Sequence, residues 1–584
     1  MTFARHDDQG HVLISDFSAC LPRDAISWVE GKDTWLLKRY KAGAIEGVML
    51  TAEPGIVVPE ASYTLDVDGW HAIYVGVYQP DQRACSIEMR LTNDKVRRVV
   101  SGCAFLHETY GWIVEGHWKN ADIERQSLHL FKAARNRAYL AYVKLVPLTE
   151  EQVTDVKREQ VQQDTKICGG VFDVHEVLCD SPPYTPDTIR KNLEPFIGTD
   201  FKRICWGTTC STYTYLYHTK VGEVFGQGKA DFINEGNRFC AELLASSLRE
   251  GWDPLRVAVD YCHENGLEIY ADYRMDHTYP LGAYNDDFTG RFQRENQHLR
   301  CVNKDGSLDV HLSHAYPEVN AEKIAALKEQ AEYGVDGTYL DFTRFPPWIL
   351  YEPPVVDGFM KQYGEDPRNL PDNDLRWLKH KAGYMTQFMR DLRAELDSTG
   401  KRMNRRIALI AQVDCQPAFT TNPSTRADVN LVNALDLKTW IAEGLIDVLA
   451  VSRERIYSNI NLDYYIQMTK GRECKLWGVL GQTDLTLFPE DYDWQDYFGG
   501  WPRKMIPHLD ARRLLRLASD LYNQGVEGIL IWEMGGVPSL LHRWSALSRM
   551  GHKDELSRQF GSDIGRFDGY PAGIAKENVE FLEA

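Results

Sequence analysis

The first quarter of the chain consists of short β-prone segments separated by turn residues. These segments recur roughly every ten residues, which is the spacing of strands in an antiparallel β-sandwich. They cover residues 11–17, 34–40, 47–51, 70–78, 85–91, 111–116, 127–131 and 138–146. We therefore predict a β-sandwich domain over residues 1–148, followed by a polar linker or short helix over residues 149–166.

From residue 167 the pattern changes to apolar, strand-like runs that alternate with amphipathic segments. The runs cover residues 169–174, 203–207, 267–273, 337–342, 407–413, 446–451, 476–480 and 528–532. Helix-capping pairs such as Thr185-Pro186 and Asp253-Pro254 lie between them. Alternation of this kind predicts parallel strands joined by crossover helices. Eight such units predict a (β/α)8 barrel over residues 167–552, with an extension over residues 553–584.

An open, doubly wound α/β sheet is the alternative architecture. It is disfavoured because no Gly-x-Gly-x-x-Gly follows the first predicted strand, and no Gly-x-x-x-x-Gly-Lys-Ser/Thr occurs in the chain. The twelve cysteines are scattered and form no Cys-x-x-Cys pair, which favours reduced, buried thiols over a zinc site. We therefore expect neither a nucleotide cofactor nor a metal.

Charge and hydropathy narrow the range of partners. Acidic residues outnumber basic ones by 84 to 66, a formal net charge of -18, and no basic run of the kind that follows a phosphate backbone occurs. We expect no nucleic-acid partner. The first residues lack an apolar run of signal-peptide length, and no later segment is apolar enough to span a bilayer. For the chain as printed, we expect no membrane partner and a cytoplasmic location.

One acidic residue lies at the end of the fourth predicted barrel strand. Residues 337–342 are apolar or β-prone apart from Asp341, and the pair Pro346-Pro347 then stops the strand from continuing. A carboxylate at the end of a strand buried on both faces costs free energy unless it is paired or used. Two interpretations remain: a functional role, or a structural ion pair with Arg344 or another arginine.

Barrel enzymes carry their functional residues at the carboxyl ends of the strands, where this chain offers acids and aromatic rings. Glycoside hydrolysis needs a proton donor, a second carboxylate, and aromatic faces for sugar rings. As catalytic carboxylates we predict Asp341, Asp414 and Glu533. Asp341 and Asp414 end neighbouring strands, so their side chains should lie about 5 to 10 Å apart. The predicted substrate-binding residues are His175, Trp206, Asp272, Tyr273, His277, Arg344, Glu454 and Trp532.

The segment Gly334-Val335-Asp336-Gly337-Thr338-Tyr339-Leu340-Asp341-Phe342-Thr343-Arg344-Phe345-Pro346 resembles the strand-four signature of glycosyl-hydrolase-like family ten barrels. The segment 262–271 resembles the strand-three segment of the same family. This resemblance implies a carbohydrate-active barrel whose nucleophile is Asp341. In such relatives the acid comes from strand five or six, which matches Asp414 or Glu454 here by position only, and Glu533 on strand eight is a further alternative.

Two sandwich segments carry a second resemblance. The segments 67–78 and 138–148 resemble strands of jelly-roll carbohydrate-binding modules, in which a Gly-Trp/Tyr strand and a closing Tyr-x-x-Val-Lys-Leu strand recur. The resemblance implies a sugar-binding role for the first domain. The alternative is a purely supporting role, because alternating aromatic residues also mark the two faces of any β-sandwich.

Other functions compete with glycoside hydrolysis. The pattern Asp173-x-His175 is similar to the start of metal-dependent amidohydrolase barrels, but their later histidines are missing from strands five and six. A non-catalytic carbohydrate-binding protein on a barrel scaffold is the second alternative. Arginines near the predicted strand ends (Arg274, Arg344, Arg453 and Arg455) favour an acidic or sulfated glycan as the ligand.

Overall fold

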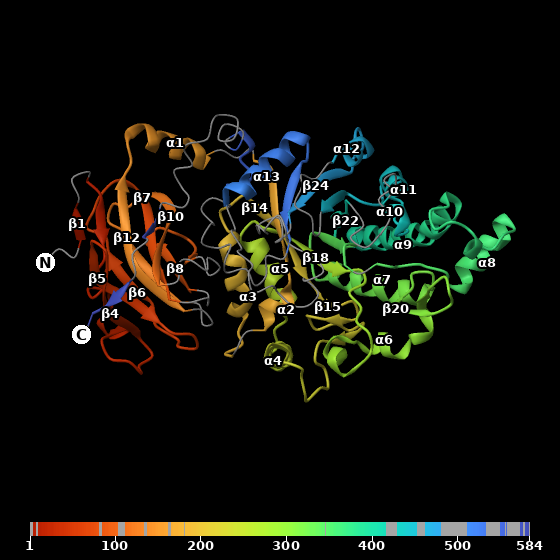
Figure 1. Ribbon diagram of the computed structural model, residues 1–584, viewed down its shortest axis with the longest axis horizontal. Coiled ribbons are helices and arrows are strands. Elements are labelled where there is room, and N and C mark those ends of the chain that lie inside the picture. Colours follow the sequence, from red (N-terminus) through yellow and green to blue (C-terminus); the bar gives the residue numbers. More distant parts are fainter. Residues whose placement is uncertain are drawn as a thin grey trace.

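The computed structural model consists of a β-sandwich domain beside a barrel domain, with both chain termini on the sandwich side (Figure 1). This confirms the predicted fold class. The residues that the structure describes are 4–6, 10–80, 85–102, 111–132, 137–161, 165–179, 182–344, 346–415, 429–452, 462–480, 511–532, 549–554, 556, 573–575 and 579–582.

The sandwich is built from two antiparallel sheets. The strands of the larger sheet are β1 (Ala4–His6), β2 (Val12–Ile14), β3 (Ile26–Ser27), β4 (Trp35–Ala42), β5 (Ile45–Ala52), β7 (Trp70–Gln79), β10 (Trp112–Asp122), β12 (Ala138–Pro147), β26 (Gly573–Ala575) and β27 (Glu580–Phe581). The smaller sheet has the order β6-β11-β8-β9, formed by β6 (Ala61–Thr64), β11 (Ser127–Phe131), β8 (Cys85–Leu91) and β9 (Arg98–Gly102). Alternate apolar residues of both sheets fill the core between them.

The C-terminal end of the chain returns to this sandwich. Strand β26 pairs antiparallel with β10, and β27 pairs antiparallel with β4. These pairings satisfy backbone groups on the two outer strands of the main sheet path, edges that would otherwise be open to pairing with another chain. The chain therefore finishes on the first domain, which the sequence pattern had not indicated.

The two domains are joined by a helix and by buried arginine contacts. Helix α1 (Glu150–Val161) covers most of the predicted linker. Arg98, on β9, donates from Nη1 to the backbone oxygens of Glu194 at 3.2 Å and Pro195 at 2.5 Å, at the start of the barrel. Burial lowers the pKa of Arg98 to about 10, which is still far above neutrality. A charged, hydrogen-bonded side chain therefore holds the sandwich against the barrel.

The barrel consists of eight parallel strands in a closed ring, in sequence order. The strands are β13 (Ile167–Phe172), β14 (Phe201–Gly207), β18 (Glu268–Arg274), β21 (Gly337–Asp341), β22 (Ala408–Asp414), β23 (Val448–Ser452), β24 (Lys475–Leu480) and β25 (Gly528–Ile531). Closure of the ring excludes the open-sheet alternative, and every strand lies within two residues of its predicted position.

Helices connect the strands and surround the ring (Figure 1). They are α2 (Val174–Leu178), α3 (Pro186–Leu193), α4 (Glu235–Glu250), α5 (Pro254–Glu264), α6 (Arg291–Glu295), α7 (Pro317–Glu332), α8 (Pro353–Tyr363), α9 (Leu375–Arg402), α10 (Val429–Val432), α11 (Leu437–Ala442), α12 (Asp463–Thr469) and α13 (Ala511–Gln524). The predicted caps are present: Asp253 accepts the backbone N–H groups of Leu255 and Arg256, and Thr185 forms a capping box. Among the helices described, none has the length and apolarity needed to cross a membrane.

Two long connections extend the carboxyl end of the barrel. The segment after β14 forms β15 (Thr209–Ser211), β16 (Thr214–Tyr215) and β17 (Glu223–Val224), and the segment after β18 forms β19 (Arg300–Val302) and β20 (Leu308–Leu312). These elements build a wall on one side of the barrel mouth. This is the end of the barrel at which a site is expected.

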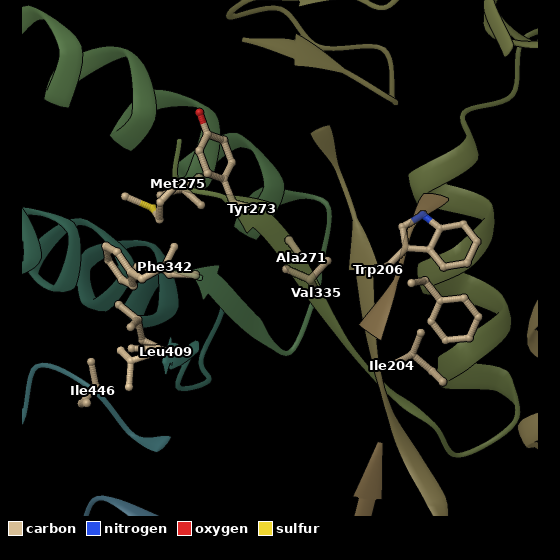
Figure 2. Packing of buried hydrophobic residues seen from close by; sticks show 14 of the residues in the cluster. Ile204, Trp206, Ala271, Tyr273, Met275, Val335, Phe342, Leu409 and Ile446 are labelled. Carbon is tan, nitrogen blue, oxygen red and sulfur yellow. The ribbon is translucent and has the colours of Figure 1, made fainter. Parts of the chain in front are cut away.

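Alternate residues of each barrel strand belong to different cores. One set, which includes Val171, Tyr270 and Tyr339, fills the barrel interior. The other set packs against the helices, and Figure 2 shows part of it, including Trp206 and Tyr273. Side chains alternate along a strand, so odd and even positions face opposite sides; we call this the parity of a residue. Parity decides which residues at the strand ends face the inside of the barrel.

Candidate active site

Asp341 faces the barrel interior at the carboxyl end of β21. It has the same parity as Tyr339 in the inner core and is 1% exposed. Its Oδ1 accepts the backbone N–H of Thr343 at 2.8 Å and the Thr343 hydroxyl at 2.5 Å. Its Oδ2 is buried and has no hydrogen-bond partner among the described residues. One carboxylate oxygen is thus anchored, while the other is buried and makes no such contact with a described residue.

The anchoring hydroxyl is the end of a chain of hydrogen bonds. Tyr339 donates from its hydroxyl to Oε1 of Gln412, and Nε2 of Gln412 donates to Oγ1 of Thr343 at 3.4 Å. Gln412 is the register partner of Asp341 on the neighbouring strand β22. Each donor in this series of hydrogen bonds points toward Asp341. The two neighbouring strands therefore hold the Asp341 side chain as a hydrogen-bond acceptor.

Asp272 is a second buried acid beside Asp341. It lies on the adjacent strand β18, two residues before Arg274, the register partner of Asp341. The Cα atoms of Asp272 and Asp341 are therefore about 8 Å apart, and both residues have the inward parity. Oδ1 of Asp272 is also buried without a partner among the described residues. Burial and the nearby charge of Asp341 raise the pKa of Asp272 well above its usual value, which favours the protonated form of this carboxyl group.

Asp414 is the third inward acid, at the end of β22. It lies two residues beyond Gln412, so its Cα is about 8 Å from that of Asp341. Unlike Asp272 it is partly exposed, and the hydroxyl of Tyr465 donates to its backbone oxygen at 3.4 Å. It lies nearer to the barrel mouth than the other two acids.

A charged pair, Asp173 and Arg274, connects the ends of β13 and β18. Arg274 donates from Nη2 to Oδ2 of Asp173 at 2.9 Å and from Nη1 to Nδ1 of His277 at 3.2 Å. Burial would raise the pKa of Asp173, but Arg274, His175 and Arg344 together outweigh burial and hold that pKa below its usual range. Arg274 is therefore neutralised by Asp173, and the pair forms one side of the site.

Arg344 and Trp532 follow the strands β21 and β25, which flank β18 and β13 in the ring. The Arg344 guanidinium lies 4.3 Å from the ring centre of Trp532, within cation–π distance. Trp532 follows β25 and packs against the inner core, and both side chains are partly exposed. These two predicted binding residues therefore meet at the barrel mouth.

Trp206 and Tyr273 are corrections to the sequence prediction. Both have outward parity and are buried among the helices, with exposures of 1% and 0%. The ring centroids of Trp206 and Phe172 are 5.8 Å apart, and the Tyr273 hydroxyl donates to the backbone oxygen of Thr212 at 3.0 Å. Neither ring can stack on a sugar inside the barrel.

His175 also differs from its predicted role. It lies on the short helix α2, where its ring makes edge contacts with Phe225 at 5.1 Å and Phe288 at 5.9 Å. Its Nε2 lies 3.7 Å from Sγ of Cys179. These contacts give His175 a packing role at the side of the barrel mouth.

Glu454 and Glu533, two of the predicted acids, lie outside the described residues, as do Arg453 and Arg455. The sequence prediction missed Thr343. A signal for Thr343 was present, because an Asp followed two residues later by Thr favours a local turn in which the carboxylate accepts the later backbone N–H.

The outward position of Trp206 gives a testable distinction between packing and binding. Trp206→Ala should lower the free energy of unfolding of the barrel by about 3–5 kcal/mol, since it removes a large buried ring. Trp206→Phe, which keeps an aromatic ring, should leave the Michaelis constant for any substrate unchanged. Denaturant titration and steady-state kinetics measure the two effects. A raised Michaelis constant with unchanged stability would contradict the outward placement.

Among the described residues, no three His, Cys, Asp or Glu side chains are arranged so that they hold a metal ion. The described part of the site is thus a set of carboxylates, arginines and aromatic rings. Such a set can exchange protons, attack an electrophilic carbon and bind hydroxyl groups.

Comparison with known proteins gives only distant likenesses. The sequence matches no protein-family model and no curated protein. The fold is similar to that of α-L-fucosidase isoenzyme 2 from Paenibacillus thiaminolyticus, at 11% identity and a TM-score of 0.39, over 66% of this chain and 49% of that one. It is also similar to a glycoside hydrolase family 18 N-acetylglucosaminidase from Paenibacillus barengoltzii, at 10% identity and a TM-score of 0.32, over 66% and 99%.

A third solved structure, a GH18 chitinase from Cycas revoluta in complex with (GlcNAc)3, is 10% identical with a TM-score of 0.32, over 65% of this chain and 99% of that one. This chain spans about half the length of the fucosidase. These three solved structures are glycoside hydrolases, but likenesses this low carry no argument about the activity of this chain. The predicted resemblance to family ten barrels and to a jelly-roll module stays a prediction.

Proposed function

We propose that this chain is a glycoside hydrolase that cleaves an oligosaccharide or polysaccharide. The observation that supports the proposal is the pair of buried carboxyl groups of Asp341 and Asp272. They lie on adjacent strands, and each has one oxygen without a partner among the described residues. One is anchored as an acceptor, and the pKa of the other is raised, which favours its protonated form. Glycoside hydrolysis requires this difference between two neighbouring carboxyl groups.

In the proposed reaction Asp341 is the nucleophile. Its Oδ2 attacks the anomeric carbon and forms a covalent bond while the bond from that carbon to the leaving oxygen breaks. The proton of Asp272 moves to the leaving oxygen. Asp272, now a carboxylate, then takes a proton from water as that water attacks the anomeric carbon, which releases Asp341 and restores the proton on Asp272. Asp414 and Glu533 are alternatives for the acid, Asp414 because it lies nearer to the mouth.

The arginine at the mouth supports a substrate that carries negative charge. The Arg344 guanidinium stacks on Trp532 at the rim. A planar cation beside an aromatic face can bind the carboxylate or sulfate of a sugar whose ring packs on the Trp. We therefore propose an acidic or sulfated glycan. Equal affinity for neutral and charged oligosaccharides of the same length would refute this part.

The activity is tested with a panel of defined neutral, uronic-acid and sulfated oligosaccharides. Proton NMR during the first turnovers identifies the cleaved linkage and the anomeric configuration of the product. A nucleophilic Asp341 predicts a product that keeps the configuration of the substrate. Inversion would assign Asp341 the role of a base that activates water. Binding without cleavage of any glycan would favour a non-catalytic carbohydrate-binding protein.

A further inference from the structure

Three cysteines from three different elements meet at helix α2, outside the set of groups that the proposed reaction uses. Cys179 directly follows α2, Cys210 is on β15 and Cys240 is on α4. Helix α2 packs against both β15 and α4 (Figure 1). All three side chains are reduced. Long stretches of sequence separate them, so only the folded chain brings the thiols together.

The thiol of Cys179 lies between an imidazole and a second thiol. Its Sγ is 3.7 Å from Nε2 and 3.9 Å from Nδ1 of His175, within hydrogen-bond distance for sulfur. Cys240 forms a side-chain hydrogen bond with Cys179, and Cys210 forms one with His175. We call these four residues the thiol cluster.

Cys179 also lies against the first turn of α4. A Cβ atom added to Gly236, the second residue of that helix, would be 3.5 Å from Sγ of Cys179. Cys240 follows Gly236 by four residues, so it lies one turn further along the same face of the helix. The N-terminus of a helix carries a partial positive charge, which favours the thiolate form of a cysteine beside it.

The members of the thiol cluster differ in charge and in accessibility. Burial alone would lower the pKa of His175, but its interaction with Cys210 and its hydrogen bonds with Cys179 and Cys210 raise that pKa well above its usual value. This favours the imidazolium form, a proton acceptor and counter-charge for a thiolate. Burial raises the pKa of Cys240 well above its usual value, so this group remains a thiol. Cys210 and Cys240 are buried, whereas Cys179 is partly exposed.

We propose that Cys179 and Cys240 form a peroxide-sensitive disulfide site, in which Cys179 reacts first and Cys240 closes the bond. A partly exposed thiol beside a positive charge, with a second thiol in contact, is the arrangement that such oxidation requires. The bond would join α2 to α4. Helix α2 begins directly after Asp173, which accepts from Arg274 at the barrel mouth. The proposal does not depend on glycoside hydrolysis, because no step of it involves a glycan.

The oxidant in the proposed reaction is hydrogen peroxide. His175 takes the proton of Cys179, and the thiolate attacks one peroxide oxygen while the O–O bond breaks. The leaving hydroxide takes the proton from His175, which gives one water and a sulfenic acid on Cys179. The sulfur of Cys240 then attacks the sulfur of Cys179, the S–O bond breaks, and the proton of Cys240 leaves with the hydroxyl group as a second water. The two thiols thus lose two electrons to one peroxide molecule.

The test treats the purified full chain with a small molar excess of hydrogen peroxide, then denatures it and alkylates the remaining thiols. Peptide mapping by mass spectrometry should find Cys179 linked to Cys240, with a loss of two hydrogen atoms that dithiothreitol reverses. Cys262, a buried thiol on α5, is the internal control and should remain fully alkylated. In urea, where the fold is lost, this preference for one pair should disappear.

Substitutions separate the order of the two steps. Cys240→Ser should stop the reaction at a sulfenic acid on Cys179, which dimedone labels, whereas Cys179→Ser should leave Cys240 alkylated. His175→Gln should slow the oxidation of Cys179 about tenfold, because less of it is a thiolate. A link from Cys179 to a different cysteine, oxidation of Cys262 as fast as that of Cys179, or no disulfide in the treated wild type would overturn the proposal. The wild-type peptide map decides this even if a variant fails to fold.

Discussion

Asp341→Asn is expected to reduce the turnover of any cleaved glycan by a factor on the order of 10⁴ while ligand affinity is largely kept. The amide has nearly the shape of the carboxylate and can still accept the two hydrogen bonds from Thr343 through its oxygen. It is, however, a poor nucleophile, so the glycosyl bond to Oδ2 cannot form. Steady-state kinetics on the cleaved oligosaccharide, with calorimetry for affinity, separates the loss of turnover from a loss of binding.

A smaller replacement tests the nucleophilic role directly. Asp341→Gly leaves space beside the anomeric carbon, and added azide should fill it and form a glycosyl azide of inverted configuration from a substrate with a good leaving group. Proton NMR of the product determines that configuration. A glycosyl azide of retained configuration would assign the acid/base role to Asp341. If azide restores no activity and the wild-type product has the inverted configuration, Asp341 activates water instead.

Asp336→Asn is the matched control for this experiment. Asp336 precedes the same strand, β21, at its opposite end, where it accepts from Nε2 of His263 at 3.0 Å and from the backbone N–H of Ile269 at 2.8 Å. It therefore stabilises the base of the barrel and lies far from the mouth. Its replacement should lower stability and leave the turnover number unchanged. A comparable loss of turnover in both variants would mean that Asp341→Asn acts through the fold.

The fold could be predicted from the sequence because strand and helix signals agree with each other. Each barrel strand is a short apolar run, and capping residues such as Asp253 and Asp436 fix where the helices begin. The closed ring follows once eight such units are recognised. The return of the C-terminal strands to the sandwich could not be predicted, because strands of two or three residues have no pattern of their own.

The candidate site could be predicted only in part, and parity explains the difference. Barrel strands are buried on both faces, so their sequences do not alternate and do not show which residues point inward. Asp341 could be recognised because a charge is conspicuous in an apolar run. Trp206 and Tyr273 could not be assigned, since an aromatic ring fits either face. The contacts of His277 with Arg274 and Tyr279 could not be predicted, because only the folded chain brings these side chains together.

Asp272→Asn has the second large expected effect, and the nature of the leaving group should control it. If Asp272 supplies the proton, its loss should lower the turnover of natural glycans by about 10²- to 10⁴-fold. Aryl glycosides whose leaving groups need no protonation should be much less affected. Asp414→Asn is the comparison: it should show the weaker dependence on the leaving group. If turnover depended more strongly on the leaving group in Asp414→Asn than in Asp272→Asn, Asp414 would be the acid.

The pH dependence of the same variant provides an independent check. Burial and the charge of Asp341 raise the pKa of Asp272, so the wild type should lose activity as the pH rises through that raised value, and Asp272→Asn should lack this alkaline decline.

The free energy of unfolding of the wild type should also fall as the pH rises. The folded state holds a proton that the unfolded chain releases above about pH 4, so the stabilising contribution of Asp272 is complete below that pH and is lost as the pH rises to the folded pKa. Asp272→Asn should therefore be at least as stable as the wild type at neutral pH, with a melting temperature that depends less on pH. An unchanged alkaline decline, or a variant that is destabilised equally at pH 5 and pH 8, would show that Asp272 does not hold the catalytic proton.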